Sequence, residues 1–356
     1  MQRKTKKKAA PERISEEYYQ ISSEILASFP KFRLPLPLFR YREEVGQLLP
    51  IVQRDERIST EQQELIRELC EEGDLFVSRA DYPIYSKHIC KQLDLILVDK
   101  NLKDAEIASI CIQALGMRMG DFIDQPVKPV FEQLYRDLMT FGEYIWTDKY
   151  RLKTFMRRIN RKHNLINHSI NTLITGLWLL TVNLSSDMQI KRKEYDRIIT
   201  ALACHDIGMS KIPAFILSKT VPLKPDEKEK IPPHTLAGAK IAQKMELGWD
   251  ELVQATMEHH ERLDGSGYPR RIRDAEISKV GRLTAIADSF CAMISERPYA
   301  PAKDPADAAA ELVNAPNLYD NRLAVILRNS IVSKAFGTIP EIGAQPDDLN
   351  VPKENR

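Results

Sequence analysis

Histidines and aspartates gather in the second half of this sequence, where five of its seven histidines lie at positions 168, 205, 234, 259 and 260. The doublets His205–Asp206 and His259–His260, and the single Asp288, stand at the ends of apolar runs. An unpaired carboxylate or imidazole would be costly to bury there. Neutral imidazole and carboxylate together suit divalent iron, manganese and zinc. The pattern therefore indicates a metal site assembled from several helix ends.

Each of these residues also has an ordinary structural explanation. A single histidine is more often a surface or satisfied core residue than a ligand, and a lone His-Asp or His-His doublet is weak evidence. The joint arrangement is much less expected by chance, because it recurs at the ends of apolar helices in one region. His88 and His163 are interpreted as ordinary residues, since His163 precedes His168 by five positions and would not share its helical face.

Two metal ions would explain the doublets. Asp206 could bridge both ions while His205 binds one of them, and His259–His260 could complete the other. Two metals about 3.5–4 Å apart can activate a bridging hydroxide and hold a phosphoryl group. The sequence contains no G-x-S-x-G motif, no Walker A loop and no plausible Ser-His-Asp set. Hydrolysis of a phosphate ester is therefore the expected chemistry.

Helices are expected to position these residues. Residues 165 to about 338 have helical patterns only, separated by loops that proline and glycine mark. His234 follows Pro232–Pro233 at a predicted helix start. The most apolar run, 170–184, is too short to span a bilayer, which takes about 20 residues, and predicts a buried core helix. No transmembrane segment is expected.

The first part of the chain has a mixed pattern. Strands are predicted at 38–44, 48–55 and 74–79, and a helix at 59–73 that Ser59 or Thr60 caps and Gly73 ends. A long helix then carries an apolar heptad stripe, broken only at Asp148: Phe131, Leu134, Leu138, Phe141, Ile145, Leu152, Phe155 and Ile159. The stripe indicates either a coiled-coil seam, which would allow a homodimer through residues 128–162, or a helix packed on its own domain.

Composition is that of an ordinary soluble globular protein, with 356 residues, 43% hydrophobic and 29% charged. A net charge of +2 is too small to attract nucleic acid or an anionic membrane to the whole protein, so no DNA partner is expected. The five cysteines are scattered and form no CxxC pair, which favours reduced thiols in a cytoplasmic protein. The basic start lacks the apolar run of a signal peptide.

Three motifs closely resemble those of the HD-GYP family, the bacterial branch of HD-domain phosphohydrolases that act on cyclic di-GMP: "HDIG" at 205–208, "HHERLDGSGYP" at 259–269 and "ADSFCAMISERPY" at 287–299. The resemblance covers residues 160 to 338 and implies an all-α helical bundle, so the fold class expected for the chain is mainly α. It implies one metal held by His168, His205, Asp206 and Asp288. It implies a second metal held by Asp206, His234, His259 and His260.

The resemblance also implies an activity and its residues. His205 and Asp206 would be catalytic, and the substrate contacts would be Gly267, Tyr268, Pro269, Arg297 and Lys211. The cofactors would be two divalent ions, iron or manganese, with zinc, nickel or magnesium as alternatives. The substrate would be cyclic di-GMP or a related nucleotide.

Four positions depart from the family pattern. Met209 replaces a lysine, Cys291 an aspartate, and Ala300 a frequent basic residue. Asn164 replaces a glutamate associated with a third metal, so two metals are expected. These changes keep the predicted metal ligands but leave fewer charged side chains to contact the substrate. Two functions lead: a cyclic di-GMP phosphodiesterase, or a catalytically weak adaptor that binds metal together with a nucleotide or a signalling protein. A hydrolase of another phosphate ester is a third alternative, which the intact Gly-Tyr-Pro motif disfavours.

Five segments are expected. They are a basic tail, disordered or partly helical, at 1–28; a regulatory module at 29–127; a linking helix at 128–164; the phosphohydrolase domain at 165–340; and a C-terminal tail at 341–356.

Overall fold

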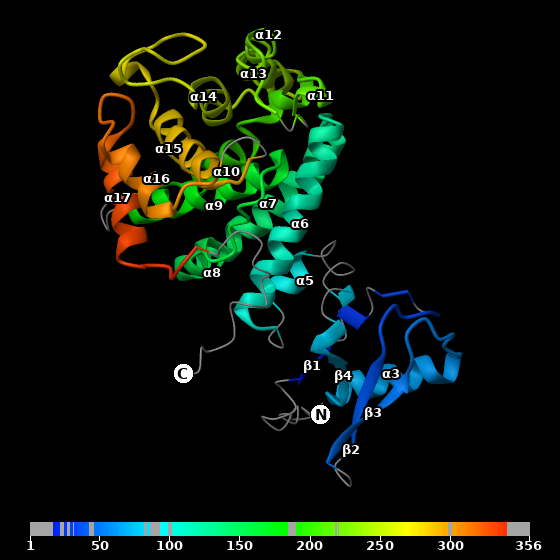
Figure 1. Ribbon diagram of the computed structural model, residues 1–356. Helices are drawn as coiled ribbons and strands as arrows, with labels where there is room; N and C mark the ends of the chain where they lie inside the picture. Colours follow the sequence, from blue (N-terminus) through cyan, green and yellow to red (C-terminus); the bar gives the residue numbers. More distant parts are fainter. Residues whose placement is uncertain are drawn as a thin grey trace. The chain divides into compact units, whose positions relative to one another are not determined.

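The computed structural model describes residues 17–21, 25–26, 29–30, 32–42, 46–81, 84–85, 93–98, 102–183, 190–217, 219, 221–297 and 301–339. Most of the expected N-terminal tail and all of the expected C-terminal tail lie outside these residues, as do His88 and Ala300. The chain divides into two compact units, Met1–Ala114 and Leu115–Arg356. The elements of each unit are shown in Figure 1.

The first unit contains an antiparallel sheet in the order β1-β4-β2-β3, with β1 Tyr18–Gln20, β2 Leu38–Arg42, β3 Gln47–Val52 and β4 Leu75–Ser78. The last three are the predicted strands. Strand β1 falls within the segment expected as a tail. It pairs Tyr18 with Ser78, far away in sequence, and buries Tyr19. Three residues are too short for a recognisable strand pattern, so only the pairing partner reveals this strand.

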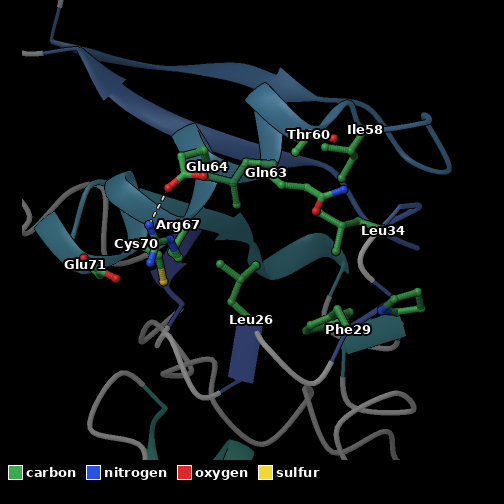
Figure 2. A pocket seen from close by; sticks show the side chains of 12 residues that line it. Leu26, Phe29, Leu34, Ile58, Thr60, Gln63, Glu64, Arg67, Cys70 and Glu71 are labelled. Atoms are coloured by element: carbon green, nitrogen blue, oxygen red, sulfur yellow. Dashed lines mark hydrogen bonds and ion pairs between the residues drawn. The ribbon is translucent and has the colours of Figure 1, made fainter.

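Helix α3, Thr60–Glu72, has the predicted ends. The Ser59 side chain accepts the N–H of Gln62, and the Gln62 side chain accepts the N–H of Ser59, which is a capping box. Gly73 ends the helix with a φ of 81°, a left-handed conformation that favours glycine. A cavity of about 410 Å³ lies beside α3 (Figure 2). Buried apolar side chains such as Leu34 and Ile58 line it, together with the exposed ion pair of Glu64 and Arg67.

Helices account for the remaining elements of both units. The first unit adds η1 Arg79–Asp81, α5 Leu93–Val98 and the start of α6 Asp104–Asp124. The second unit has, after α6, the elements α7 Lys128–Thr147, η2 Lys149–Arg151, α8 Leu152–Met156, α9 Leu165–Asn183, α10 Arg192–Cys204, η3 Ile207–Lys211, α11 Ala214–Leu217, α12 Pro225–Lys228, α13 His234–Lys244, α14 Asp250–Glu258, η4 Asp274–Glu276, α15 Lys279–Ile294, α16 Pro305–Val313 and α17 Asn321–Val332. The mainly α fold class is confirmed.

The expected continuous helix through the heptad stripe is wrong at one point. Helix α7 ends at Thr147, because Asp148 adopts extended backbone and its side chain accepts the N–H of Tyr150. The chain then forms η2 and α8. All eight stripe residues are buried within the second unit, where α7 packs on α10 and α8 packs on α9. Packing on its own domain is therefore the alternative that the structure adopts.

Helix α9 is the centre of the second unit and packs against α10, α15 and α17 (Figure 1). A Cβ on Gly176 would lie 2.5 Å from Leu202 Cδ2, so α9 and α10 approach closely at this glycine. Among the described residues, α9 alone is long and apolar enough to cross a membrane, and 67% of its most apolar window is buried inside the protein. This degree of burial is what we predicted for a core helix of the domain.

Candidate metal centre

Six of the seven predicted ligands lie where helices of the second unit begin or end, and the seventh, Asp288, lies inside a helix. His168 lies in the first turn of α9, His205 caps the C-terminus of α10, and His234 opens α13. His259 caps the C-terminus of α14, and Asp288 lies within α15. The side chains form two groups in which the ligand atoms lie within 4.8 Å of one another: His168, His205, Asp206 and Asp288; and Asp206, His234, His259 and His260. These are the two sets that the sequence predicted.

The Asp206 carboxylate belongs to both groups. Its Oδ2 lies 3.8 Å from His168 Nε2 and 3.6 Å from His205 Nε2. Its Oδ1 lies 3.2 Å from His234 Nε2 and 3.4 Å from His259 Nε2. Each oxygen thus faces a different group, which is the arrangement a bridging carboxylate requires.

Backbone carbonyls orient three of the histidines. A carbonyl oxygen can only accept a hydrogen bond, so the contacted Nδ1 must carry a proton, and in the neutral ring Nε2 keeps a free lone pair directed into the site. Such contacts with the outer nitrogen are typical of metal-binding histidines. The contacts are His205 Nδ1 to Leu202 O at 2.9 Å, His234 Nδ1 to Ile231 O at 2.7 Å and His259 Nδ1 to Ala255 O at 2.8 Å.

Two buried acceptor atoms of the site consequently lack a hydrogen-bond donor. His205 Nε2 and Asp206 Oδ1 are buried and have no hydrogen-bond partner among the described residues, although imidazole nitrogens surround the carboxylate. Buried polar atoms are normally paired, so this arrangement calls for a cation between the acceptors. The donor set of imidazole and carboxylate therefore fits divalent transition metals.

The electrostatics of the site favour ionised carboxylates. Burial alone would raise the pKa of Asp206, but the neighbouring His205, His234 and His259 hold it well below its usual range. The pKa of Asp288 is lowered in the same way, mainly by His168. Burial lowers the pKa of His259, and that of His260 falls well below its usual range for the same reason.

The pKa of His205, unlike that of His259 or His260, is raised. Burial opposes the charged form of His205, but the carboxylates of Asp206 and Asp288 outweigh this effect and raise its pKa to about 9. Two anionic carboxylates surrounded by histidines that cannot all be protonated form a centre with a strong preference for bound cations.

Two glycines bring η3, α13 and α14 together, and sequence reasoning missed their role. A Cβ on Gly208 would lie 1.8 Å from His234 O and 2.6 Å from Gly238 N. A Cβ on Gly238 would lie 2.5 Å from Thr256 Cγ2. Only glycines permit this contact, which places His234 against Asp206. The signal in the sequence was the glycine of the "HDIG" motif itself.

Two buried glutamates flank the His259–His260 doublet and were also missed. Glu261 is 1% exposed, and its Oε1 accepts the backbone N–H groups of Arg270 at 2.6 Å and Arg271 at 3.1 Å. Glu258 pairs with the Arg270 guanidinium at 2.5 Å and accepts the N–H of Ser278 at 2.8 Å. These contacts fix the loop that returns over the metal ligands.

The predicted recognition loop contacts His260, one of the predicted metal ligands. The Tyr268 ring stacks on His260 with 4.7 Å between ring centroids and 29° between planes, and Tyr268 N donates to His260 O at 3.2 Å. A Cβ on Gly267 would lie 2.4 Å from His260 O, so this position requires glycine. A cis peptide bond joins Tyr268 and Pro269. The loop therefore places an aromatic ring at the edge of the centre.

The other predicted substrate contacts are less closely placed. Lys211 is exposed at the end of η3. Arg297 is half-buried after the end of α15, and its Nε has no partner among the described residues.

Two of the departures from the family pattern have local explanations. Asn164 caps α9, because its Oδ1 accepts the N–H of Asn167 at 2.7 Å. Cys291 is fully buried 3.4 Å from Thr175 Oγ1, and burial raises its pKa to about 12, so it stays a neutral thiol.

Comparisons with known proteins find an HD domain that lies mostly in the second half of the chain. Residues 160–323 match the HD domain family. The chain is 37% identical over 138 residues to a cyclic di-GMP phosphodiesterase from Thermotoga maritima, covering 37% of this chain and 36% of that protein. It is 27% identical over 186 residues to the cyclic di-GMP phosphodiesterase PdeB from Borreliella burgdorferi, covering 52% and 47%. It is 38% identical over 120 residues to the 3'3'-cGAMP-specific phosphodiesterase 2 from Vibrio cholerae, covering 33% and 22%.

The chain thus spans less than half the length of each of these curated relatives. Among solved structures, it is similar to Bd1817, an HDG"Y"P protein from Bdellovibrio bacteriovorus, with a TM-score of 0.57 and 14% identity. That match covers 89% of this chain and 100% of the other. At this identity the likeness concerns the fold alone.

Proposed function

We propose, for a chain that belongs to the HD-GYP family through its HD domain, that it is a metal-dependent phosphodiesterase hydrolysing cyclic di-GMP. The observation that carries the proposal is the Asp206 carboxylate, whose two oxygens face two separate groups of ligands. Two divalent ions bound there would supply an activated water molecule and positive charge beside the phosphate. Iron or manganese is the proposed metal, with zinc, nickel or magnesium as alternatives.

The residues of the chain then have separate tasks. His205 and Asp206 act at the reaction centre, and their rigid helix-end positions hold the geometry that in-line attack on phosphorus needs. Tyr268 lies against His260, where a nucleotide would meet an aromatic surface. Arg297 is proposed to contact a phosphate oxygen and stabilise the charge that develops on it. Gly267 and Pro269 shape the loop, and Lys211 is the cation at the rim.

The second candidate function is that of a catalytically weak adaptor that binds metal and nucleotide or a signalling protein. Met209 and the neutral, buried Cys291 favour it, because neither can supply the charge expected at its position. The similarity to a 3'3'-cGAMP-specific enzyme supplies a second possible substrate, so both cyclic dinucleotides belong in the assay.

The test measures metal and turnover on the same preparation. The full chain is loaded anaerobically with Fe(II) or Mn(II), bound metal per chain is determined by elemental analysis, and cyclic di-GMP and 3'3'-cGAMP are followed by chromatography. Two metals with linear or mononucleotide product support the proposal. Two metals without product from either nucleotide would favour the adaptor. A His259→Ala variant with unchanged metal content would contradict the ligand assignment.

Other expectations stay predictions. These are a regulatory role for residues 29–127, the linking role of 128–164, a cytoplasmic location and a homodimer. The cavity beside α3 is a place in the expected regulatory module where a small molecule would fit. A homodimer through 128–162 would have to use the exposed face of α7, because the apolar stripe is buried.

A further inference from the structure

A short backbone pairing joins the segment before α9 to the segment after α15. Glu296 N donates to Arg161 O at 2.7 Å, and His163 N donates to Glu296 O at 3.3 Å. Lys162 and Glu296 form the corresponding parallel bridge. Because Arg297 directly follows Glu296, this pairing holds His163 and Arg297 in neighbouring backbone positions.

Both segments lead into the metal centre. His163 stands five residues before His168, and Arg297 stands nine residues after Asp288. His168 Nε2 and Asp288 Oδ1 are 2.8 Å apart, so α9 and α15 are in contact at the ligands themselves. The pair of His163 and Arg297 therefore lies on the same two elements as one group of metal ligands.

Each of the two side chains has one buried nitrogen without a partner. His163 Nδ1 and Arg297 Nε are both inaccessible to solvent and make no hydrogen bond with the described residues. Such atoms are costly to leave unpaired. They are chemically complementary, since an arginine Nε always carries a hydrogen and a neutral imidazole has one nitrogen that can accept it.

The charge state of His163 suits an acceptor. Burial lowers its pKa to about 4, with further lowering by the neighbouring Arg297 and His168, while Asp206 acts in the opposite direction. The ring is therefore neutral near pH 7.

We infer that His163 is a positioning residue. When a phosphate binds at the metal centre, the Nδ1 of His163 accepts a hydrogen bond from Arg297 Nε, a bond that neither atom makes in this structure, and so directs the guanidinium toward that phosphate. This inference rests on the proposed function for its phosphate. An arginine held at Nε presents its two terminal nitrogens in the fixed geometry that bidentate phosphate contact uses. A neutral imidazole is better suited to this role than a carboxylate, which would compete with the phosphate for the guanidinium.

The test uses inorganic phosphate as the probe and the metal-loaded full chain as the receptor. Binding is measured by titration calorimetry for wild type, His163→Leu, His163→Asn, Arg297→Met and the double variant His163→Leu/Arg297→Met. Leucine removes the acceptor, whereas the asparagine Oδ1 can replace Nδ1. Loss of a bidentate charge-assisted contact is expected to weaken phosphate binding by about tenfold in His163→Leu and by at least as much in Arg297→Met.

The double variant separates positioning from a merely structural role. It should bind phosphate no more weakly than Arg297→Met alone, because His163 acts through that arginine. His163→Asn should remain within about threefold of wild type, and all variants should retain the wild-type metal content. Additive losses in the double variant, metal loss in His163→Leu, wild-type binding by His163→Leu, or no phosphate binding by wild type would each overturn the inference.

A second measurement does not depend on any variant folding. In histidine-labelled, phosphate-bound wild type, nitrogen NMR should show neutral His163 with the proton on Nε2, and a proton on Nδ1 would contradict the inference. Failure of the proposed function can be distinguished from failure of this inference. If phosphate binding depends on the pair but neither cyclic dinucleotide is hydrolysed, the positioning role stands and the phosphodiesterase assignment does not.

Discussion

The Nε2 atoms of His234 and His259 lie 3.1 Å apart, while the Nδ1 of each ring contacts a backbone carbonyl. Each Nδ1 must therefore carry a proton, so when both rings are neutral two Nε2 lone pairs point at one another beside Asp206 Oδ1. Such a contact is unfavourable unless a cation lies among the three atoms. The predictions below follow from this centre and from the contacts that hold it.

Replacing Asp206 by asparagine should remove the shared ligand. Because both groups use this carboxylate, bound metal should fall from the expected two ions per chain to at most one. Turnover should fall by at least about 100-fold, since even outer contacts of metal ligands are worth 10–100-fold in affinity or activity. Elemental analysis and product chromatography measure both effects. Asp226→Asn, at an exposed position, is the matched control and should behave as wild type. Full metal content in Asp206→Asn would show that this carboxylate is no bridge.

The substitution Gly208→Ala should destabilise the fold and weaken metal binding. The added Cβ would lie 1.8 Å from His234 O, so α13 must move away from η3. We expect a loss of about 3 kcal/mol in the free energy of unfolding, at the upper end of the range for overpacking, together with weaker metal binding. Gly248→Ala is the control, because nothing lies within 4 Å of its Cβ position. Equal denaturation midpoints for the two variants would contradict the packing role of Gly208.

Glu261 should stabilise the recognition loop through its two backbone contacts. Glu261→Ala leaves the N–H groups of Arg270 and Arg271 without their acceptor. A loss of about 2 kcal/mol in the free energy of unfolding is expected, which is typical of hydrogen bonds to a charged group. Glu261→Gln keeps an acceptor oxygen and should lose less. Urea denaturation tests this, and an equal loss in both variants would mean that burial of the side chain, and not hydrogen bonding, matters.

The low pKa of His163 predicts a pH-dependent stability. The folded chain holds the ring neutral down to about pH 4, whereas the unfolded chain protonates it near its ordinary value of 6.5. Unfolding therefore takes up a proton between these values, and the free energy of unfolding falls as pH decreases from 6.5 to 4. In chelator-treated protein, wild type should lose stability more steeply than His163→Asn across this window. Parallel curves would contradict the lowered pKa.

Local sequence patterns predicted the elements that depend on neighbours along the chain. The capping residues Ser59 and Gly73 ended α3 as expected, and the apolar spacing identified α9 as a core helix. The pattern could not see β1, because a three-residue strand exists only through its partner β4. It also could not see that Asp148 turns the chain, since the apolar spacing resumes in α8 after the turn.

The sequence by itself determined which side chains could bind metal and that most of them lie near helix ends, because residue type and hydrophobic spacing are local properties. Only the tertiary structure decided that the two oxygens of Asp206 face different groups, that Gly208 contacts the backbone at His234, and that His163 lies beside the segment of Arg297. These relations join residues up to 134 positions apart in the chain. Their distances are set by how helices pack, and helix packing depends on side-chain contacts that no single segment encodes.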